Sequence, residues 1–298
     1  MNIKNYLVVF LILFISSCSD KEPPVDSLAV AISPPQECGL TTDNETCEIV
    51  VFPENSQTSR EYILHTPSVE LDDSPPLFIF LHGAGGIAGA SAGPFGIRKY
   101  MTSAKFVGVF LNGKADEFGF RTWEEDDVEF ISYIIDQLII NKNIDSNRVY
   151  IFGYSMGGFL ANLAGCRIPS KVTAIFSFAG NLISPLSNCA SDGNVAIHNL
   201  HATGDEIIFY NGSDGDYLSA IEAIEEWSIL NQCDASFIES DVFDLTNDVN
   251  GKDSITRTFE NCIKPVQLTT IEGSGHSPLF QTLNLQQLMS DFFDASQR

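Results

Sequence analysis

The sequence predicts an α/β fold in which helices cover both faces of a mostly parallel sheet. Short apolar, β-branched runs without helical periodicity recur along the chain and predict strands. These runs are Glu61–His65, Leu77–Leu81, Phe106–Leu111, Arg148–Gly153, Val172–Phe178, Ala196–His201 and Val266–Ile271. Amphipathic segments between several of them predict helices at Glu124–Asn141, Met156–Cys166, Tyr217–Leu230 and Asn284–Phe293. Because strands and helices alternate, we expect mainly parallel pairing.

The N-terminal residues resemble the export signal of a bacterial lipoprotein. After Lys4, the apolar run Leu7–Ile15 is too short to span a bilayer as a helix. It leads into Ile15–Cys18, which reads ISSC and resembles the lipobox, where the Cys is acylated and becomes the first mature residue. We therefore expect a signal peptide at 1–17 and a lipid on Cys18 that holds an exported protein to the cell envelope. An ordinary signal peptide with an unmodified Cys18 is the alternative.

The remaining chain is expected to contain one folded domain behind a spacer. Residues 18–35 are rich in Pro, Ser and charge, a composition that cannot build a core and predicts a flexible segment. No internal repeat or second change in composition is found after it, so 36–298 is predicted to be a single catalytic domain. Asp and Glu number 39 against 16 Lys and Arg. This excess disfavours nucleic acid and bare anionic membranes as partners, so membrane contact is expected only through the lipid.

A nucleophile motif lies between a predicted strand and a predicted helix. The segment Gly153–Gly157 reads GYSMG, which matches G-x-S-x-G, and it follows the strand RVYIF. Side chains two residues before and two residues after Ser155 would collide with neighbouring backbone in so tight a turn, which explains both glycines. The motif predicts an exposed Ser155 hydroxyl at the carboxyl edge of the sheet. A tight packing turn without catalytic function is the alternative.

The general base can be chosen by elimination. Five histidines occur: His65, His82, His198, His201 and His276. In folds built around this elbow the chain order is Ser, then acid, then His, and the first two histidines precede Ser155. His198 and His201 lie in a predicted strand, where a spacing of three places them on opposite faces, and they are interpreted as packed or hydrogen-bonded structural side chains. His276 lies in a Gly-rich loop after the last predicted strand and is the predicted base.

The acid that orients this base is expected on the loop after the preceding strand. That loop contains Asp205, which we predict to hold the imidazole tautomer and stabilise the imidazolium. Glu206 is the adjacent competitor, and Asp192 and Asp214 are more distant ones. Because turns favour Asp, the other alternative is that Asp205 is a surface turn residue without a catalytic role.

A glycine-rich loop follows the strand LFIFL. The segment His82–Gly86 reads HGAGG and matches the HGGG-type loop that supplies a backbone N–H to an oxyanion. We predict that the N–H groups of Ala84 and Met156 form the oxyanion hole. The same loop also satisfies the dinucleotide fingerprint G-x-G-x-x-G/A. Pro94 and two nearby glycines interrupt the helix which that alternative requires, so no organic cofactor is expected. No metal is expected either, because the sequence has no CxxC and its histidines lack zinc-type spacing.

These segments together resemble the esterase family that contains poly(3-hydroxybutyrate) depolymerases and feruloyl or acetylxylan esterases. The resemblance covers roughly Tyr62–Phe280 and rests on FLHGAGG, on the segment from DDVEF to the elbow, on HATGDEIIFY and on GSGHS. It implies an α/β-hydrolase fold with nucleophile, acid and base at Ser155, Asp205 and His276. Family members commonly have Asn at the position of Met156 and Trp-Pro where this chain has Ser-Pro after the base. These departures affect the expected substrate pocket.

The cysteines predict disulfides in an exported protein. Setting aside Cys18, an even number remains, although the sequence alone leaves the pairing open. We favour sequential pairs: Cys38 with Cys47, Cys166 with Cys189, and Cys233 with Cys262. The family resemblance agrees, since members often carry a Cys after the elbow helix and a pair flanking the last strand.

The resulting hypothesis is a serine carboxylic-ester hydrolase that works through an acyl-enzyme. Its expected partner is a small or oligomeric ester, of the polyhydroxyalkanoate type or of the feruloyl and acetyl type found on plant polysaccharides. A serine peptidase on the same fold and a non-catalytic surface-binding protein are the alternatives. Arg121 is a candidate for binding a substrate carboxylate. Candidate pocket aromatics, for which core or lid packing is the other reading, are Phe118, Phe120, Trp123 and Phe159.

Overall fold

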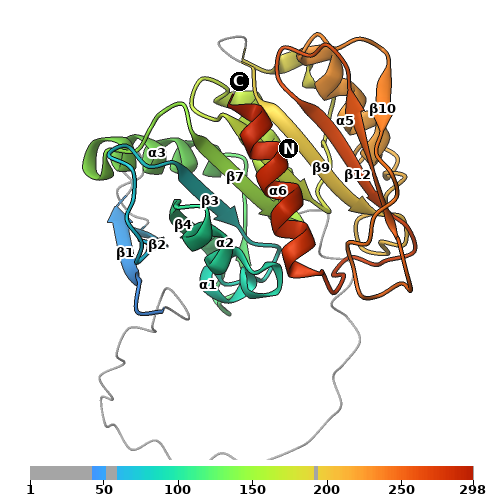
Figure 1. The fold of residues 1–298 in the computed structure, drawn as a ribbon. Coiled ribbons are helices and arrows are strands. Elements are labelled where there is room, and N and C mark those ends of the chain that lie inside the picture. Colours follow the sequence, from blue (N-terminus) through green and yellow to red (C-terminus); the bar gives the residue numbers. More distant parts are fainter. Residues whose placement is uncertain (1–41, 52–58, 191–193, 298) are drawn as a thin grey trace, which may run out of the picture.

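A computed structural model describes residues 42–51, 59–190 and 194–297, and Figure 1 shows their arrangement. In these three ranges no helix is long and apolar enough to cross a membrane. Outside the described residues lie the predictions for the N-terminal part: the signal peptide at 1–17, Cys18, the spacer at 18–35 and Cys38.

Within the described chain, a ten-stranded sheet forms the centre of the molecule. Its strands, in spatial order, are β1 (Glu45–Val51), β2 (Ser59–His65), β4 (Val107–Leu111), β3 (Leu77–Leu81), β7 (Val149–Tyr154), β8 (Ala174–Phe178), β9 (Ala196–Ala202), β12 (Val266–Ile271), β11 (Ser254–Phe259) and β10 (Phe237–Glu239). The strands from β4 to β12 in this order pair in parallel, and the outer strands pair antiparallel. A separate hairpin pairs β5 (Lys114–Ala115) with β6 (Arg121–Thr122).

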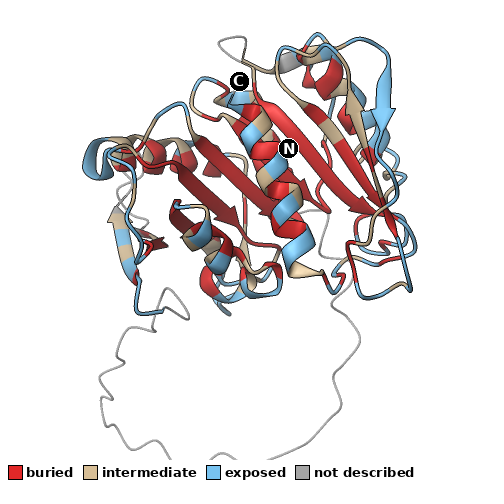
Figure 2. Ribbon diagram, viewed as in Figure 1, coloured by how far each residue is buried: buried red, intermediate tan, exposed pale blue. Residues whose placement is uncertain are grey.

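Helices cover both faces of this sheet. They are α1 (Ala88–Ser91), α2 (Ile97–Ser103), α3 (Asp127–Lys142), α4 (Met156–Arg167), α5 (Ala220–Leu230) and α6 (Thr282–Ser296). Side chains of α3, α4 and α5 pack into one hydrophobic core, and those of α1, α2 and α6 pack into a second core on the other face. In Figure 1, α6 crosses the sheet diagonally, and Figure 2 shows the central strands buried beneath it. The mostly parallel α/β-hydrolase architecture predicted from the sequence is confirmed.

The parallel strands are continuous apolar runs because helices shield them on both sides. All five residues of β3 are buried, and the same is true of β4 and β8. The predicted helix at Glu124–Asn141 begins later than expected, at Asp127, after a turn in which Asp127 N–H donates to the Glu124 carbonyl at 3.1 Å. It ends at Lys142, and the capping residue Asn143 has a left-handed φ of 53° that stops the helix.

Two of the expected disulfides are present. Cys166 pairs with Cys189, which ties the end of α4 to the loop after β8, and Cys233 pairs with Cys262, which ties the end of α5 to the loop before β12. The third expected pair, Cys38 with Cys47, has one partner outside the described residues.

Candidate active site

Ser155 lies on a strained turn between β7 and α4. Its φ is 55°, a left-handed value that non-glycine residues rarely adopt. A Cβ added to Gly153 would lie 2.1 Å from the Gly157 carbonyl oxygen, and one added to Gly157 would lie 2.3 Å from the Leu81 carbonyl oxygen. Both glycines of the motif are therefore required by the close approach of backbone, as the sequence predicts. The turn holds the Ser155 side chain at the carboxyl edge of the sheet. The residue is buried there, at 5% exposure, and not exposed as the motif predicts, because the loop that carries His276 covers it.

The predicted nucleophile, base and acid come together in one hydrogen-bonded chain. His276 Nε2 lies 2.9 Å from Ser155 Oγ, and His276 Nδ1 lies 2.7 Å from Asp205 Oδ2. The other carboxylate oxygen of Asp205 accepts the backbone N–H groups of Ile207 and Ile208, each at 2.9 Å. These bonds hold the carboxylate in place, with its second oxygen facing the imidazole. The competitor Glu206 is exposed and makes none of these hydrogen bonds.

Asp205 is held in its ionised form. Burial alone would raise the pKa of this carboxyl, but hydrogen bonds from His201 and His276, together with the Ile208 N–H, lower it well below its usual range. A permanently charged acid suits the predicted role, because it can stabilise an imidazolium next to it.

Two residues that the sequence reasoning missed brace the loop that carries His276. The Tyr154 hydroxyl lies 2.6 Å from Ser277 Oγ and 3.3 Å from the His276 carbonyl oxygen. Asp248 accepts Ser274 Oγ at 2.7 Å and the Leu279 N–H at 3.0 Å. Tyr154 stands inside the elbow motif, beside the nucleophile, so its position was a usable signal. Nothing local in the sequence marks Asp248, because its contacts depend on the path of a distant loop.

The predicted oxyanion loop packs directly against the elbow. A Cβ added to Gly83 would lie 3.2 Å from Ser155 Cβ, which leaves space only for glycine without adjustment. Met156 is the first residue of α4, so its N–H has no partner within the helix. In the described part of the chain, neither the Met156 N–H nor the Ala84 N–H donates a hydrogen bond. Both donors therefore remain available at the loop and helix end that flank Ser155.

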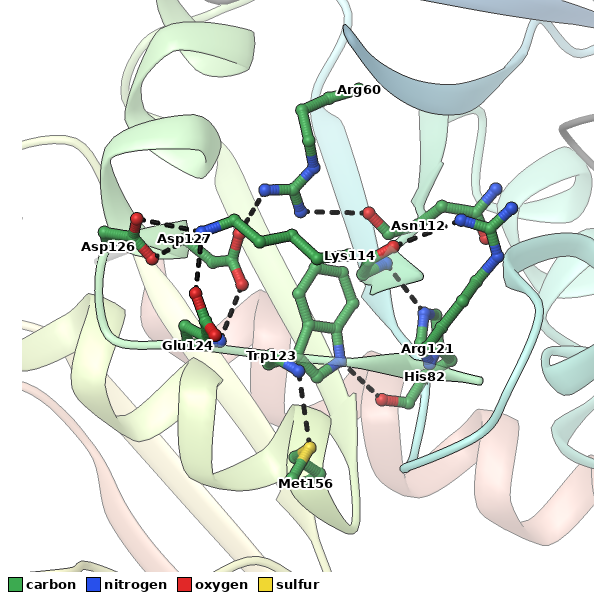
Figure 3. A network of polar contacts seen from close by, with 11 residues as sticks. Arg60, His82, Asn112, Lys114, Arg121, Trp123, Glu124, Asp126, Asp127 and Met156 are labelled. Atoms are coloured by element: carbon green, nitrogen blue, oxygen red, sulfur yellow. Dashed lines mark hydrogen bonds and ion pairs between the residues drawn. The ribbon is translucent and has the colours of Figure 1, made fainter. Parts of the chain in front are cut away.

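A buried polar network supports this loop from behind (Figure 3). Trp123 Nε1 donates to the His82 carbonyl at 2.8 Å, and the Trp123 N–H contacts Met156 Sδ at 3.4 Å. His82 Nε2 accepts the Gly113 N–H at 2.9 Å, so Nδ1 carries the proton and donates to the Gly83 carbonyl at 2.6 Å. His82 thereby holds one peptide of the predicted oxyanion loop in place as a neutral ring.

The network continues to a buried ion pair. Arg60 pairs with Asp127 and donates to the Asn112 carbonyl at 3.1 Å, while Asp127 accepts the Glu124 N–H at 2.7 Å. The ion pair thus anchors the segment that leads to Trp123.

The neutral state of His82 predicts a loss of stability in acid. Burial lowers the pKa of His82 to about 4. The unfolded chain binds a proton from about pH 6.5 downward, whereas the folded ring stays neutral until about pH 4. His82 is therefore expected to make its full contribution to the free energy of unfolding above pH 6.5. That contribution should fall by roughly 3 kcal/mol as the pH drops to 4.

Urea unfolding at several pH values measures this loss. A His82→Gln variant, which keeps polar partners without titrating, should show a shallower decline than the parent protein. Equal slopes for both proteins between pH 6.5 and 4 would contradict the assignment.

The structure places the candidate pocket residues in different environments. Trp123 is fully buried, which supports the reading of this candidate as a core residue and not as a pocket aromatic. Phe118 and Phe120 are exposed, and the Phe120 ring lies over Gly85 of the glycine loop. Phe159 is buried against Tyr217 and lines a cavity of about 210 Å³. Arg121, the candidate for a substrate carboxylate, lies 3.4 Å from Glu61 of its own chain.

The other histidines divide as their spacing predicts. His198 is buried on one face of β9, stacked on Phe176 and bonded to Thr269 Oγ1 at 2.8 Å. His201, on the opposite face, is also hydrogen-bonded, and one of its neighbours is Asp205. The interpretation of His201 as a structural side chain therefore missed its contact with the predicted acid.

Comparison with known proteins finds a family model and several related sequences that are described as esterases. Residues 112–215 match the model of the Phospholipase/Carboxylesterase family. Feruloyl esterase B of Piromyces equi is 25% identical over 69% of this chain, and a bifunctional acetylxylan esterase/xylanase of Neocallimastix patriciarum is 27% identical over 74%. The chain spans 40% and 31% of the length of these two relatives. A probable feruloyl esterase C of Aspergillus niger is 25% identical, with 73% of this chain and 76% of the relative covered.

Solved structures share the fold. An acetyl xylan esterase from Aspergillus awamori superimposes with a TM-score of 0.59 at 12% identity, covering 84% of this chain and 99% of that one. A thermostable esterase superimposes with a TM-score of 0.55 at 18% identity, covering 85% and 63%.

Proposed function

We propose that this protein, an α/β-hydrolase of the esterase type, is a serine carboxylic-ester hydrolase that works through an acyl-enzyme. The observation that carries the proposal is the continuous hydrogen-bonded chain from Ser155 through His276 to Asp205 on a strained elbow. The same hydrogen-bonded arrangement of Ser, His and Asp activates a serine hydroxyl in unrelated hydrolases, whatever the order of the three residues along the chain.

The geometry suits a two-step reaction. Ser155 Oγ attacks the ester carbonyl carbon as its proton passes to His276 Nε2, and the carbonyl oxygen becomes negative against the Ala84 and Met156 N–H groups. Collapse of this tetrahedral intermediate breaks the bond to the alcohol, which leaves with the proton from Nε2. A water molecule then loses a proton to Nε2 and attacks the acyl carbon. The acid is released and the proton returns to Ser155.

The substrate class is proposed from the relatives. Proteins described as feruloyl and acetylxylan esterases support an ester of a plant polysaccharide, bearing a feruloyl or acetyl group. Esters of the polyhydroxyalkanoate type are the second substrate class of the same reaction. The two disulfides support a site of action in an oxidising compartment outside the cytoplasm.

A hydrolysis panel tests this proposal. Purified protein would be assayed for kcat/KM on p-nitrophenyl acetate, methyl ferulate, acetylated xylan, hydroxybutyrate oligomers and a peptide p-nitroanilide. We expect hydrolysis of the esters, with methyl ferulate or acetylated xylan preferred over the oligomers. Cleavage of the anilide alone would point to a peptidase, and a folded protein inert on the whole panel would point to a binding function. Either result would overturn the proposal.

A further inference from the structure

The acid of the proposed triad touches two imidazoles rather than one. Asp205 Oδ2 lies 2.7 Å from His276 Nδ1 and 3.3 Å from His201 Nε2. His201 is 1% exposed and comes from the end of β9, four residues before the acid. The proposed mechanism uses only His276, so the second imidazole is a buried titratable group without an assigned role.

The surroundings of His201 determine where its proton lies. Its Nε2 faces two acceptors, the Ile208 carbonyl at 2.8 Å and the ionised Asp205 carboxylate. Neither can donate, so Nε2 must carry a hydrogen. The Nε2–H is hydrogen-bonded to the backbone carbonyl three residues beyond the acid, and Asp205 Oδ2 lies 3.3 Å from the same nitrogen.

The other ring nitrogen faces the side-chain amide of Asn181. His201 Nδ1 lies 3.1 Å from Asn181 Oδ1, and Asn181 Nδ2 is buried without a hydrogen-bond partner among the described residues, which favours the opposite orientation of the amide. A half-turn of this amide brings Nδ2 to Nδ1, which satisfies the donor and gives neutral His201 both of its partners. The turn leaves an amide oxygen unpaired, and buried acceptors without partners are less rare than buried donors.

We propose that His201 is a positioning residue for the catalytic acid, an imidazole whose Nε2 lies against Asp205 Oδ2 and keeps the carboxylate aimed at His276. The proposal rests on the proposed esterase function. With His201 in place, both carboxylate oxygens are held: Oδ1 accepts the Ile207 and Ile208 N–H groups, and Oδ2 lies 2.7 Å from His276 Nδ1 and 3.3 Å from His201 Nε2. A neutral donor orients the carboxylate without cancelling the negative charge that His276 needs.

This sharing also affects the pH dependence of the reaction. The base works only when neutral, so activity falls as the medium becomes acidic. His201 Nε2 and His276 Nδ1 both lie against Asp205 Oδ2, so the carboxylate interacts less strongly with His276 than it would if His201 were absent. Without it, the carboxylate would stabilise the protonated base more strongly, and the acid limb of kcat/KM would move to higher pH. The other ionisable groups facing Asp205 or His201 are Tyr154, Tyr210 and Tyr217, which stay protonated throughout this range.

A matched pair of amide substitutions tests the proposal. In His201→Gln the amide nitrogen reaches the place of Nε2, whereas in His201→Asn it reaches only the place of Nδ1. We expect His201→Asn to lower kcat on p-nitrophenyl acetate by about 10- to 100-fold, with KM unchanged and the acid limb at higher pH. His201→Gln should retain most of kcat and the parent pH profile. His198→Asn, on the opposite face of the same strand, should destabilise the fold without moving the limb.

Nitrogen-15 NMR of the parent protein tests the same point independently of any variant. The two ring nitrogens of His201, assigned by their loss in His201→Gln, should report a neutral ring with the proton on Nε2 near pH 7. An imidazolium, or a proton on Nδ1 alone, would overturn the proposal. So would equal kcat and pH profiles for the Asn and Gln variants. Failure of the esterase function itself would instead appear as absence of ester hydrolysis in the parent protein, whatever the NMR spectrum shows.

Discussion

Ser155→Ala should leave a folded protein whose kcat on p-nitrophenyl acetate is reduced by about 10⁴-fold or more. The substitution removes the oxygen that lies 2.9 Å from His276 Nε2, and the one hydroxyl left on the elbow is the Tyr154 phenol, which contacts Ser277 Oγ instead. Members of a triad act as one unit, so the remaining base and acid cannot compensate. Initial rates, with circular dichroism as a check on folding, measure the loss. Ser155→Ala removes only one oxygen from a 5% exposed site, so the unfolding midpoint should change little.

Full activity in a folded Ser155→Ala protein would exclude the serine mechanism. Residual activity needs a background control, because traces of host esterases hydrolyse the same substrate. A His276→Ala preparation made in the same way provides it, since the two variants should share one residual rate if both act in the triad.

Asp205→Asn is expected to reduce kcat by about 10⁴-fold, because an amide cannot stabilise the imidazolium and favours the wrong tautomer of His276. The amide would also set an N–H donor against the Ile207 and Ile208 N–H groups, or against the two imidazoles. Glu206→Gln is the matched control, since it makes the same chemical change one residue away on an exposed side chain. Its kcat should stay within about twofold of the parent, as surface substitutions away from special contacts have small effects.

If the Glu206 variant lost activity while Asp205→Asn kept it, the acid would be Glu206 and the geometry at Asp205 would be only structural. Loss in both would indicate that the whole loop, rather than one carboxylate, supports His276.

The parallel centre of the sheet could be predicted because its strands are buried on both faces. The expected ranges Leu77–Leu81 and Val266–Ile271 coincide with β3, in which every residue is buried, and with β12, in which every residue except Gln267 is buried. The edge strands were missed. All three residues of β10 are exposed, so its pairing with β11 leaves no apolar pattern in the sequence. The short helices α1 and α2 were missed as well, because Gly89, Gly93 and Pro94 obscure any helical period.

The residues of the site also fall into two groups, those that the sequence marks and those that it does not. Ser155, Asp205 and His276 each follow a strand that the sequence marks, so local motifs suffice to find them. His201 and Asp248 act through contacts with loops whose paths depend on tertiary packing. The spacing of four between His201 and Asp205 was a signal that could have been used, since the end of a strand lies beside the loop that leaves it. The two readings of Trp123 stay open in the sequence, because an aromatic near a predicted pocket cannot be told from a core residue without knowing its burial.

The central claim is that Ser155 becomes covalently acylated, and trapping with a fluorophosphonate tests it most directly. The reagent forms a stable phosphonyl ester only with an activated serine, so intact-mass and peptide mass spectrometry can locate it. We predict one adduct per chain, on the peptide that contains Ser155, with loss of esterase activity in step with labelling and no adduct on Ser155→Ala. Continued ester hydrolysis by an unlabelled protein, or an adduct on another residue, would contradict the claim.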